Sequence, residues 1–226
     1  ALVIARGAKI NAVGTASSPI IFTSIADEIQ PGQIQSPNLE PTLNGLWGGL
    51  LVLGNAPISA DAESVQIEGI PASDPNGLYG GTNATDDSGM LKFVSIRHGG
   101  ANIGEGNEIN GLTLGGVGSG TVIENVEVVA NQDDGIEFFG GTVNVTNALV
   151  WNVGDDAIDT DQAWAGTLTN FVVVCGDDDV VVAVVAGGFV LKALLMMMVM
   201  VTLLLLLLRL VWLLSSLLSS SQSSSS

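Results

Sequence analysis

Pairs of aspartates recur along this chain at a spacing of 22 residues, as Asp133-Asp134, Asp155-Asp156 and Asp177-Asp178. Glu137 and Asp159 lie close to the first two pairs. If each interval is one turn of a repeating fold, the pairs stack into a single acidic column. Carboxylate oxygens are hard ligands that suit Ca²⁺ better than transition metals. The column is therefore the candidate metal site, with Ca²⁺ as the candidate cation, and no other cofactor is required.

A purely structural interpretation of the same residues stays open. Aspartate suits tight corners, because its side chain accepts hydrogen bonds from nearby backbone N–H groups. Two exposed charges about 5 Å apart repel each other by only ~1 kcal/mol in bulk water. The column can therefore stand without a cation.

Paired carboxyl groups on neighbouring turns also predict a catalytic alternative. Inverting glycoside hydrolysis needs an acid and a base roughly 6.5–9.5 Å apart. Residues 131–136 and 154–158 faintly resemble the carboxylate signature of polygalacturonase-type glycosidases, but the Gly-His-Gly and Arg-Ile-Lys motifs of that family are missing. The only histidine, His98, lies upstream beside Arg97, and we interpret the two as surface residues.

The distribution of charge limits the possible partners. All 23 acidic residues lie between Asp27 and Asp179, and the formal net charge of the chain is −17. Such a surface repels nucleic-acid phosphates and anionic lipid headgroups, so neither is expected as a partner. A basic cleft that would hold an anionic sugar is not visible either.

The repeat itself predicts the fold. At a step of 22 residues, Asn125 aligns with Asn147 and Ile136 aligns with Ile158, whereas the strand-like segment 167–174 aligns better at 23. Short β-branched strands between Gly, Asn and Asp corners are typical of a solenoid, in which each coil is buried by its neighbours. We expect an all-β, parallel β-helix with coils of about 22 residues; a β-sandwich with coincidental spacing is the alternative.

The alignment also predicts which side chains point inward and which form a corner ladder. The amides of Asn125, Asn147 and Asn170 are expected to pair from coil to coil. The expected inward residues are Val126, Val128, Ile136, Phe138, Ala148, Val150, Ile158, Phe171 and Val173.

Three kinds of segment follow from this pattern. Residues 1–179 form the solenoid, and the Pro-rich segments 25–44 and 54–88 are loops that project from the coils or cap their side. Residues 180–226 are a low-complexity tail with runs such as Leu203–Leu208 and Ser219–Ser221. Misassigned residue identities, a hydrophobic membrane anchor and a true low-complexity sequence all stay open for this tail.

Several blocks in residues 1–179 resemble a known family. They include Pro19–Ser24, Trp47–Gly49, Tyr79–Gly81, Asp87–Val94, Asn107–Leu114, Val117–Thr121 and Asp133–Asn144. The resemblance is to a widespread family of uncharacterised exported and lipoprotein-type β-helix proteins of Gram-negative bacteria. It implies a right-handed parallel β-helix and a secreted or outer-surface location. The chain departs from the family after Asp179.

Two functions stay open. The first is a non-catalytic extracellular or cell-surface structural or adhesion protein, which would contact glycans, other surface proteins or further copies of itself. Only the tail or a lipid anchor would attach such a protein to a membrane. The second is a β-helix enzyme, a glycoside hydrolase or lyase, that degrades polysaccharide.

Overall fold

The computed structural model describes residues 1–101, 109–175 and 182–185, and gives no side-chain description for the last of these ranges. These residues belong to one compact unit, Ala1–Val185. The predicted tail therefore lies outside the described residues beyond position 185, as do Asp177 and Asp178. No α-helix occurs among the described residues, and none of their helices could cross a membrane.

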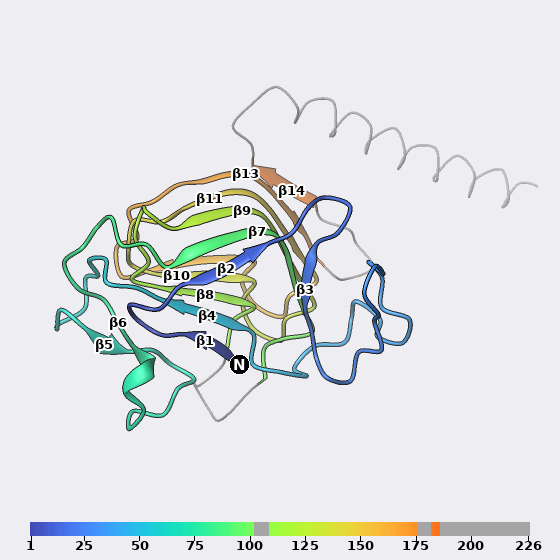
Figure 1. Ribbon diagram of the computed structural model, residues 1–226, viewed down its shortest axis with the longest axis horizontal. Helices are drawn as coiled ribbons and strands as arrows, with labels where there is room; N and C mark the ends of the chain where they lie inside the picture. The colour runs from blue at the N-terminus through green and yellow to red at the C-terminus, as the bar shows by residue number, and fades with distance from the viewer. Residues whose placement is uncertain (102–108, 176–181, 186–226) are drawn as a thin grey trace, which may run out of the picture. The chain divides into compact units, whose positions relative to one another are not determined.

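Two parallel sheets form the walls of a right-handed β-helix, so the predicted fold is confirmed. Figure 1 shows their strands stacked in successive turns. Sheet A consists, in spatial order, of β1 (Leu2–Ile4), β4 (Leu50–Leu53), β8 (Leu112–Gly115), β10 (Ile136–Phe139) and β12 (Ile158–Asp161).

Sheet B contains the longer strands. Both β2 (Ile10–Val13) and β3 (Ile20–Phe22) pair with β7, and the sheet continues through β9 and β11 to β13. The bounds of these strands are Gly89–Arg97 for β7, Val122–Val129 for β9, Asn144–Trp151 for β11 and Leu168–Val174 for β13. A last strand, β14 (Val182–Val185), pairs antiparallel with β13.

The strand register confirms the predicted repeat. Ile136 pairs with Ile158, and Val122 pairs with Asn144, each 22 residues apart. Ala148 pairs with Phe171 at 23 residues, which is the change of step expected for the segment 167–174. Equivalent side chains therefore lie one above another along the axis.

A left-handed residue bends each long strand of sheet B. Asn125, Asn147 and Asn170 have φ values of 55°, 60° and 56°, a conformation that asparagine tolerates better than most residues. The Nδ2 atom of Asn147 donates to Oδ1 of Asn125 at 2.9 Å, and Nδ2 of Asn170 donates to Oδ1 of Asn147 at 3.2 Å. The predicted asparagine ladder is confirmed.

The core runs through the middle of the coils. Of the nine predicted inward residues, Val126, Val128, Ile136, Phe138, Ala148 and Val150 are fully buried in it, Ile158 and Phe171 pack against it, and Val173 is half-buried. Trp164 closes the core at one corner, where its ring stacks on Phe138 with centroids 4.0 Å apart.

The two Pro-rich segments lie on opposite sides of the coils in Figure 1. Residues 54–88 include the hairpin of β5 (Val65–Gln66) and β6 (Leu78–Tyr79) and a 3₁₀ helix at Pro75–Gly77. This segment covers the outer face of sheet A, where Tyr79 packs edge-on against Phe139. Residues 25–44 lie against the end of sheet B, held by hydrogen bonds that include His98 Nδ1 to the Leu43 carbonyl at 2.6 Å.

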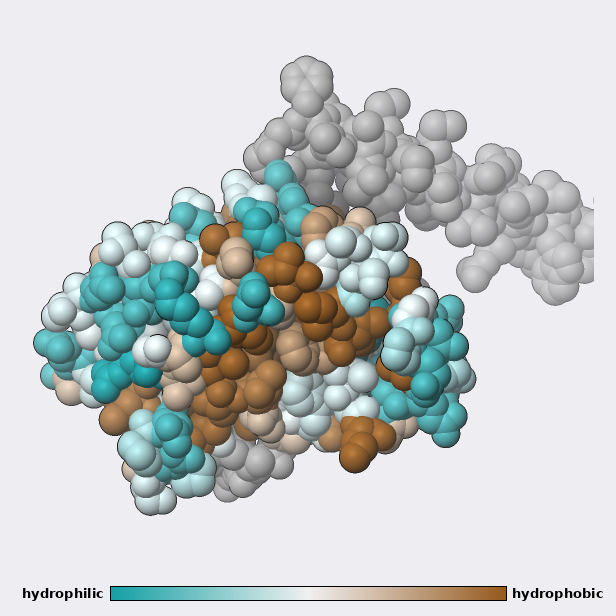
Figure 2. Space-filling view, viewed as in Figure 1, coloured by the Kyte–Doolittle hydropathy of each residue, from teal (hydrophilic) through white to brown (hydrophobic). Residues whose placement is uncertain are grey.

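The first coil pairs on one side only within the described residues. Several of its apolar side chains are exposed, with Leu2 at 39% and Val13 at 49%, whereas Ala12 is buried. Figure 2 shows apolar residues gathered in the middle of this face, over the N-terminal strands, with hydrophilic residues on the loops to either side.

Candidate cation-binding site

The aspartate pairs occupy equivalent corners of two successive coils. Asp133 and Asp134 precede β10, and Asp155 and Asp156 precede β12. The Asp134 side chain belongs to the corner, since its Oδ1 accepts the backbone N–H of Asp156 at 2.9 Å. Its carbonyl oxygen accepts from Asn131 Nδ2 at 2.7 Å and from the N–H of Gly111 at 2.9 Å. Asp134 therefore ties together three consecutive coils.

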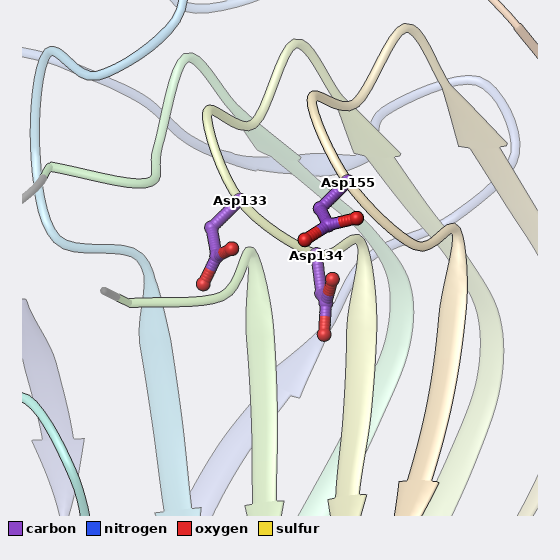
Figure 3. Close-up of side chains that lie close together, drawn as sticks. All are labelled: Asp133, Asp134 and Asp155. Carbon is purple, nitrogen blue, oxygen red and sulfur yellow. The ribbon is translucent and has the colours of Figure 1, made fainter. Parts of the chain in front are cut away.

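Three carboxyl groups converge at these corners. One oxygen each from Asp133, Asp134 and Asp155 can be chosen so that all lie within 4.8 Å of one another. Figure 3 shows Asp155 reaching from its own coil toward Asp134 of the coil before. Burial is graded across the group: Asp134 is buried, Asp133 is half-buried and Asp155 is exposed. The group is thus open to solvent on the Asp155 side.

A second group shares Asp134 and continues down the outer face of sheet A. Asp134, Glu137 and Asp159 also offer oxygens within 4.8 Å of one another. Glu137 of β10 pairs in register with Asp159 of β12, so the parallel ladder places the two side chains on the same face. Glu137 is only 7% exposed, and Asn110 Nδ2 donates a short hydrogen bond to its Oε2.

Burial perturbs the acidity of both buried carboxyl groups. Desolvation raises the pKa of Asp134 to about 7, despite the opposing hydrogen bond from Asp156, and the charges of Asp133, Asp159 and Asp155 add to the rise. Desolvation likewise raises the pKa of Glu137 to about 9, with further contributions from Glu68 and Asp134. In both groups, low polarity and like charges disfavour the ionised form.

The donor set and its spacing fit Ca²⁺. Oxygen ligands lie about 2.3–2.6 Å from a Ca²⁺ ion, so two ligands of one ion are at most about 5 Å apart. Both carboxylate groups satisfy that limit. Beside Glu137, the buried Oδ1 atom of Asn110 has no hydrogen-bond partner among the described residues. A neutral oxygen of this kind is a further ligand type that Ca²⁺ accepts.

The basic residues lie elsewhere. Among described residues, the ion pairs are Lys9–Asp87, Lys92–Glu124 and Arg97–Glu127, at 2.5, 3.0 and 3.2 Å. Arg6 donates to Ser64 Oγ and to the carbonyl of Gly80. None of these contacts involves a residue of the two carboxylate groups.

Of the six predicted ligands, the structure describes four, and three of these four come together. Asp133, Asp134 and Asp155 come together, whereas Asp156 contributes its backbone N–H and its carboxyl group belongs to neither cluster. Asp177 and Asp178 lie outside the described residues. Glu137 and Asp159, noted only as neighbours from the sequence, form the second cluster with Asp134.

The interpretation of Arg97 and His98 as surface residues is wrong. His98 is 2% exposed and the Arg97 side chain is 12% exposed, because residues 25–44 cover both. Sequence reasoning missed this cover since the covering segment is not periodic. Its only signal is its length, which is too great for a simple turn between two strands.

A family model described as a pectate-lyase-like β-helix domain matches residues 1–183. The chain matches no curated protein and no solved structure.

Proposed function

We propose that this chain, which belongs to the pectate-lyase-like β-helix domain family, is a non-catalytic extracellular or cell-surface protein that binds Ca²⁺ on its acidic corners and serves adhesion. The observation that carries the proposal is the convergence of Asp133, Asp134 and Asp155 from two coils. A cation held there would link neighbouring coils and offset the repulsion between their charges. Extracellular Ca²⁺ is abundant enough to fill weak sites of this kind.

The buried position of Glu137 favours binding over catalysis. A general acid must come within hydrogen-bond reach of its substrate, but Glu137 is 7% exposed and already bonded to Asn110. The acidic surface also repels the anionic polysaccharides on which many β-helix enzymes act.

A polysaccharide-degrading activity is the second candidate, and one observation favours it. Glu137, with a pKa of about 9, is protonated at neutral pH and lies beside Asp159 in the neighbouring strand. A protonated carboxyl group next to another carboxyl group is the arrangement that glycoside hydrolases use for proton donation.

The first experiment measures thermal unfolding with and without Ca²⁺ at matched ionic strength. A ligand at 100 times its Kd stabilises the folded state by about 2.7 kcal/mol. For a unit of this size that corresponds to a rise in Tm of about 5–11 °C. The rise should reverse with chelator and should be lost in Asp155→Asn, whose exposed carboxyl group makes no hydrogen bond or ion pair among the described residues.

The matched control is Asp161→Asn. It removes one exposed carboxylate from β12, the strand that follows Asp155, but Asp161 belongs to neither cluster. This variant should keep the full response to Ca²⁺. A wild-type Tm that does not respond to Ca²⁺ would reject the cation site and leave the aspartates as corner residues.

The second experiment assays the protein for release of reducing ends and unsaturated sugars from neutral and acidic polysaccharides. The adhesion proposal expects no turnover. Turnover that disappears in Glu137→Gln would replace it with the enzymatic alternative.

A further inference from the structure

A cleft opens between residues 34–41 and the outer face of sheet B, at the strand ends that precede the acidic corners. Its volume is about 360 Å³, which lies within the range of small-molecule sites. Ile34, Leu39 and Pro41 form one wall, and the ends of β7, β9 and β11 form the floor. The cleft is not part of the candidate cation site and uses none of its residues.

The floor carries a fixed polar network. Ser95 Oγ donates to Glu127 Oε1 at 2.6 Å, and Arg97 donates to Ser95 Oγ at 2.7 Å through Nε and to Glu127 Oε1 at 3.2 Å through Nη2. Nη1 of Arg97 donates to the Ile34 carbonyl at 2.5 Å. These contacts use three of the five guanidinium N–H groups and one of the two Glu127 oxygens. Donors and an acceptor therefore remain side by side for a ligand.

An aromatic side chain lies beside this network. Arg97, Val129 and Trp151 form one row across three adjacent strands, because Arg97 pairs with Val129 and Val129 pairs with Trp151. Trp151 is thus two strand spacings, about 10 Å, from Arg97 along the floor. Its side chain lines the cleft and is 38% exposed, and Leu149 of the same strand pairs directly with Glu127.

The wall is held in place, so the cleft is preformed. Asn152 Nδ2 donates to the Pro41 carbonyl at 2.6 Å, and the His98 ring bonds to the Leu43 carbonyl. On the strand side, Trp47 Nε1 donates to the Arg97 carbonyl at 2.7 Å. A preformed site loses less free energy to ordering when a ligand binds.

We propose that this cleft binds a neutral carbohydrate. A sugar ring presents an apolar C–H face, which suits the indole of Trp151, and a rim of hydroxyl groups that both donate and accept, which suits paired Arg97 and Glu127. Charge selects the neutral class: Glu40 and Glu127 outnumber Arg97 in the lining, so an anionic ligand is repelled. The inference names the ligand class for the adhesive role proposed above and rests on that role.

The test is isothermal titration of the full chain with neutral and acidic oligosaccharides: gluco-, manno- and galacto-oligosaccharides against oligogalacturonate. The expected result is binding of at least one neutral series. Trp151→Ala should weaken that binding at least tenfold, Glu127→Gln should weaken it several-fold, and Trp151→Phe should retain most of it because an aromatic face remains. The matched control is Met90→Ala, since Met90 is 39% exposed on β7 of the same sheet but does not line the cleft.

Each titration is run in chelator and in Ca²⁺, with Tm measured for every variant. Absence of neutral-sugar binding, binding of oligogalacturonate alone, or unchanged binding in a folded Trp151→Ala protein each overturns the inference. A protein whose Tm responds to Ca²⁺ but which binds no sugar rejects the cleft and leaves the cation site standing. A protein that binds sugar but whose Tm does not respond to Ca²⁺ rejects the cation site and leaves the cleft standing.

Discussion

Among the described residues, the buried carboxyl groups are those of Asp86, Asp134 and Glu137, and two of the three lie in the acidic clusters. The spacing of residues predicted that the aspartate pairs would occupy equivalent corners, because a fixed period fixes the position on the coil. It did not predict that Asp134 would bond to the backbone of the next coil, or that Glu137 would lie under Asn110. The period gives the position of each residue on its coil but not the hydrogen bonds of its side chain, so neither contact follows from it.

The raised pKa values predict that stability falls as pH rises above 5. The folded state keeps a proton on Glu137 up to about pH 9 and on Asp134 up to about pH 7, whereas the unfolded chain releases both near pH 4. The unfolded state then binds fewer protons, so the free energy of unfolding decreases with pH. Denaturant titrations at pH 5, 7 and 9 should show a loss of a few kcal/mol, since one pKa unit corresponds to about 1.4 kcal/mol.

Two comparisons check this assignment. Glu137→Gln stays neutral at every pH, so its stability should change less between pH 5 and 9 than that of the wild type. Asp161→Asn, which removes an exposed carboxyl group, should keep the wild-type slope. A Glu137→Gln protein with the full slope would place the titrating group elsewhere.

Among the elements, the long strands of sheet B were the most predictable. Their inward valines and the Asn125–Asn147–Asn170 ladder follow from the 22- and 23-residue steps, because stacked coils repeat both the backbone conformation and the side chain. The equivalent position in β7 is Phe93, which is left-handed with φ of 50° although no asparagine marks it. Because phenylalanine has no preference for the left-handed conformation, the sequence did not indicate a bend at Phe93.

Substitutions of Asn147 separate the contribution of the ladder's amide hydrogen bonds from that of the left-handed backbone conformation. Asn147→Ala removes both amide hydrogen bonds and places alanine in a left-handed conformation, which should cost about 2–3 kcal/mol. Asn147→Gly removes the same bonds but tolerates the conformation, so it should be about 1 kcal/mol less destabilising. Chemical denaturation measures both. Equal losses would mean that only the hydrogen bonds matter, and no loss would mean that the ladder does not stabilise the fold.

The segment 54–88 depends on one aromatic side chain. Tyr79 is 2% exposed, packs on Phe139 and accepts a hydrogen bond from Gln162 Nε2 at 2.7 Å. Tyr79→Ala should cost about 3–5 kcal/mol by analogy with other large-to-small core changes. The loss should concentrate in this segment, so limited proteolysis should cut within 54–88 while the coils stay intact. Tyr79→Phe, which keeps the ring, is the control and should resist cleavage.

At the scale of the whole molecule, composition and period together predicted an acidic all-β solenoid, and the structure has this fold. The packing of segments 25–44 and 54–88 onto the two sheets could not be predicted, because neither segment repeats. Segment 25–44 nevertheless covers Arg97 and His98 on sheet B, and segment 54–88 packs Tyr79 onto the apolar outer face of sheet A. The cleft proposed to bind a ligand therefore arises where an irregular segment meets the regular coils.

The net charge of −17 makes stability depend on salt. Like charges on a compact surface repel one another, and the screening length shortens from about 30 Å at 0.01 M salt to about 3 Å at 1 M. The Tm should therefore rise steadily with NaCl. Screening depends on ionic strength alone, so CaCl₂ at the same ionic strength should add a further rise only if the carboxylate groups bind the ion. In Asp155→Asn that further rise should vanish while the NaCl dependence remains. Coincident NaCl and CaCl₂ curves for the wild type would assign the whole effect of Ca²⁺ to screening.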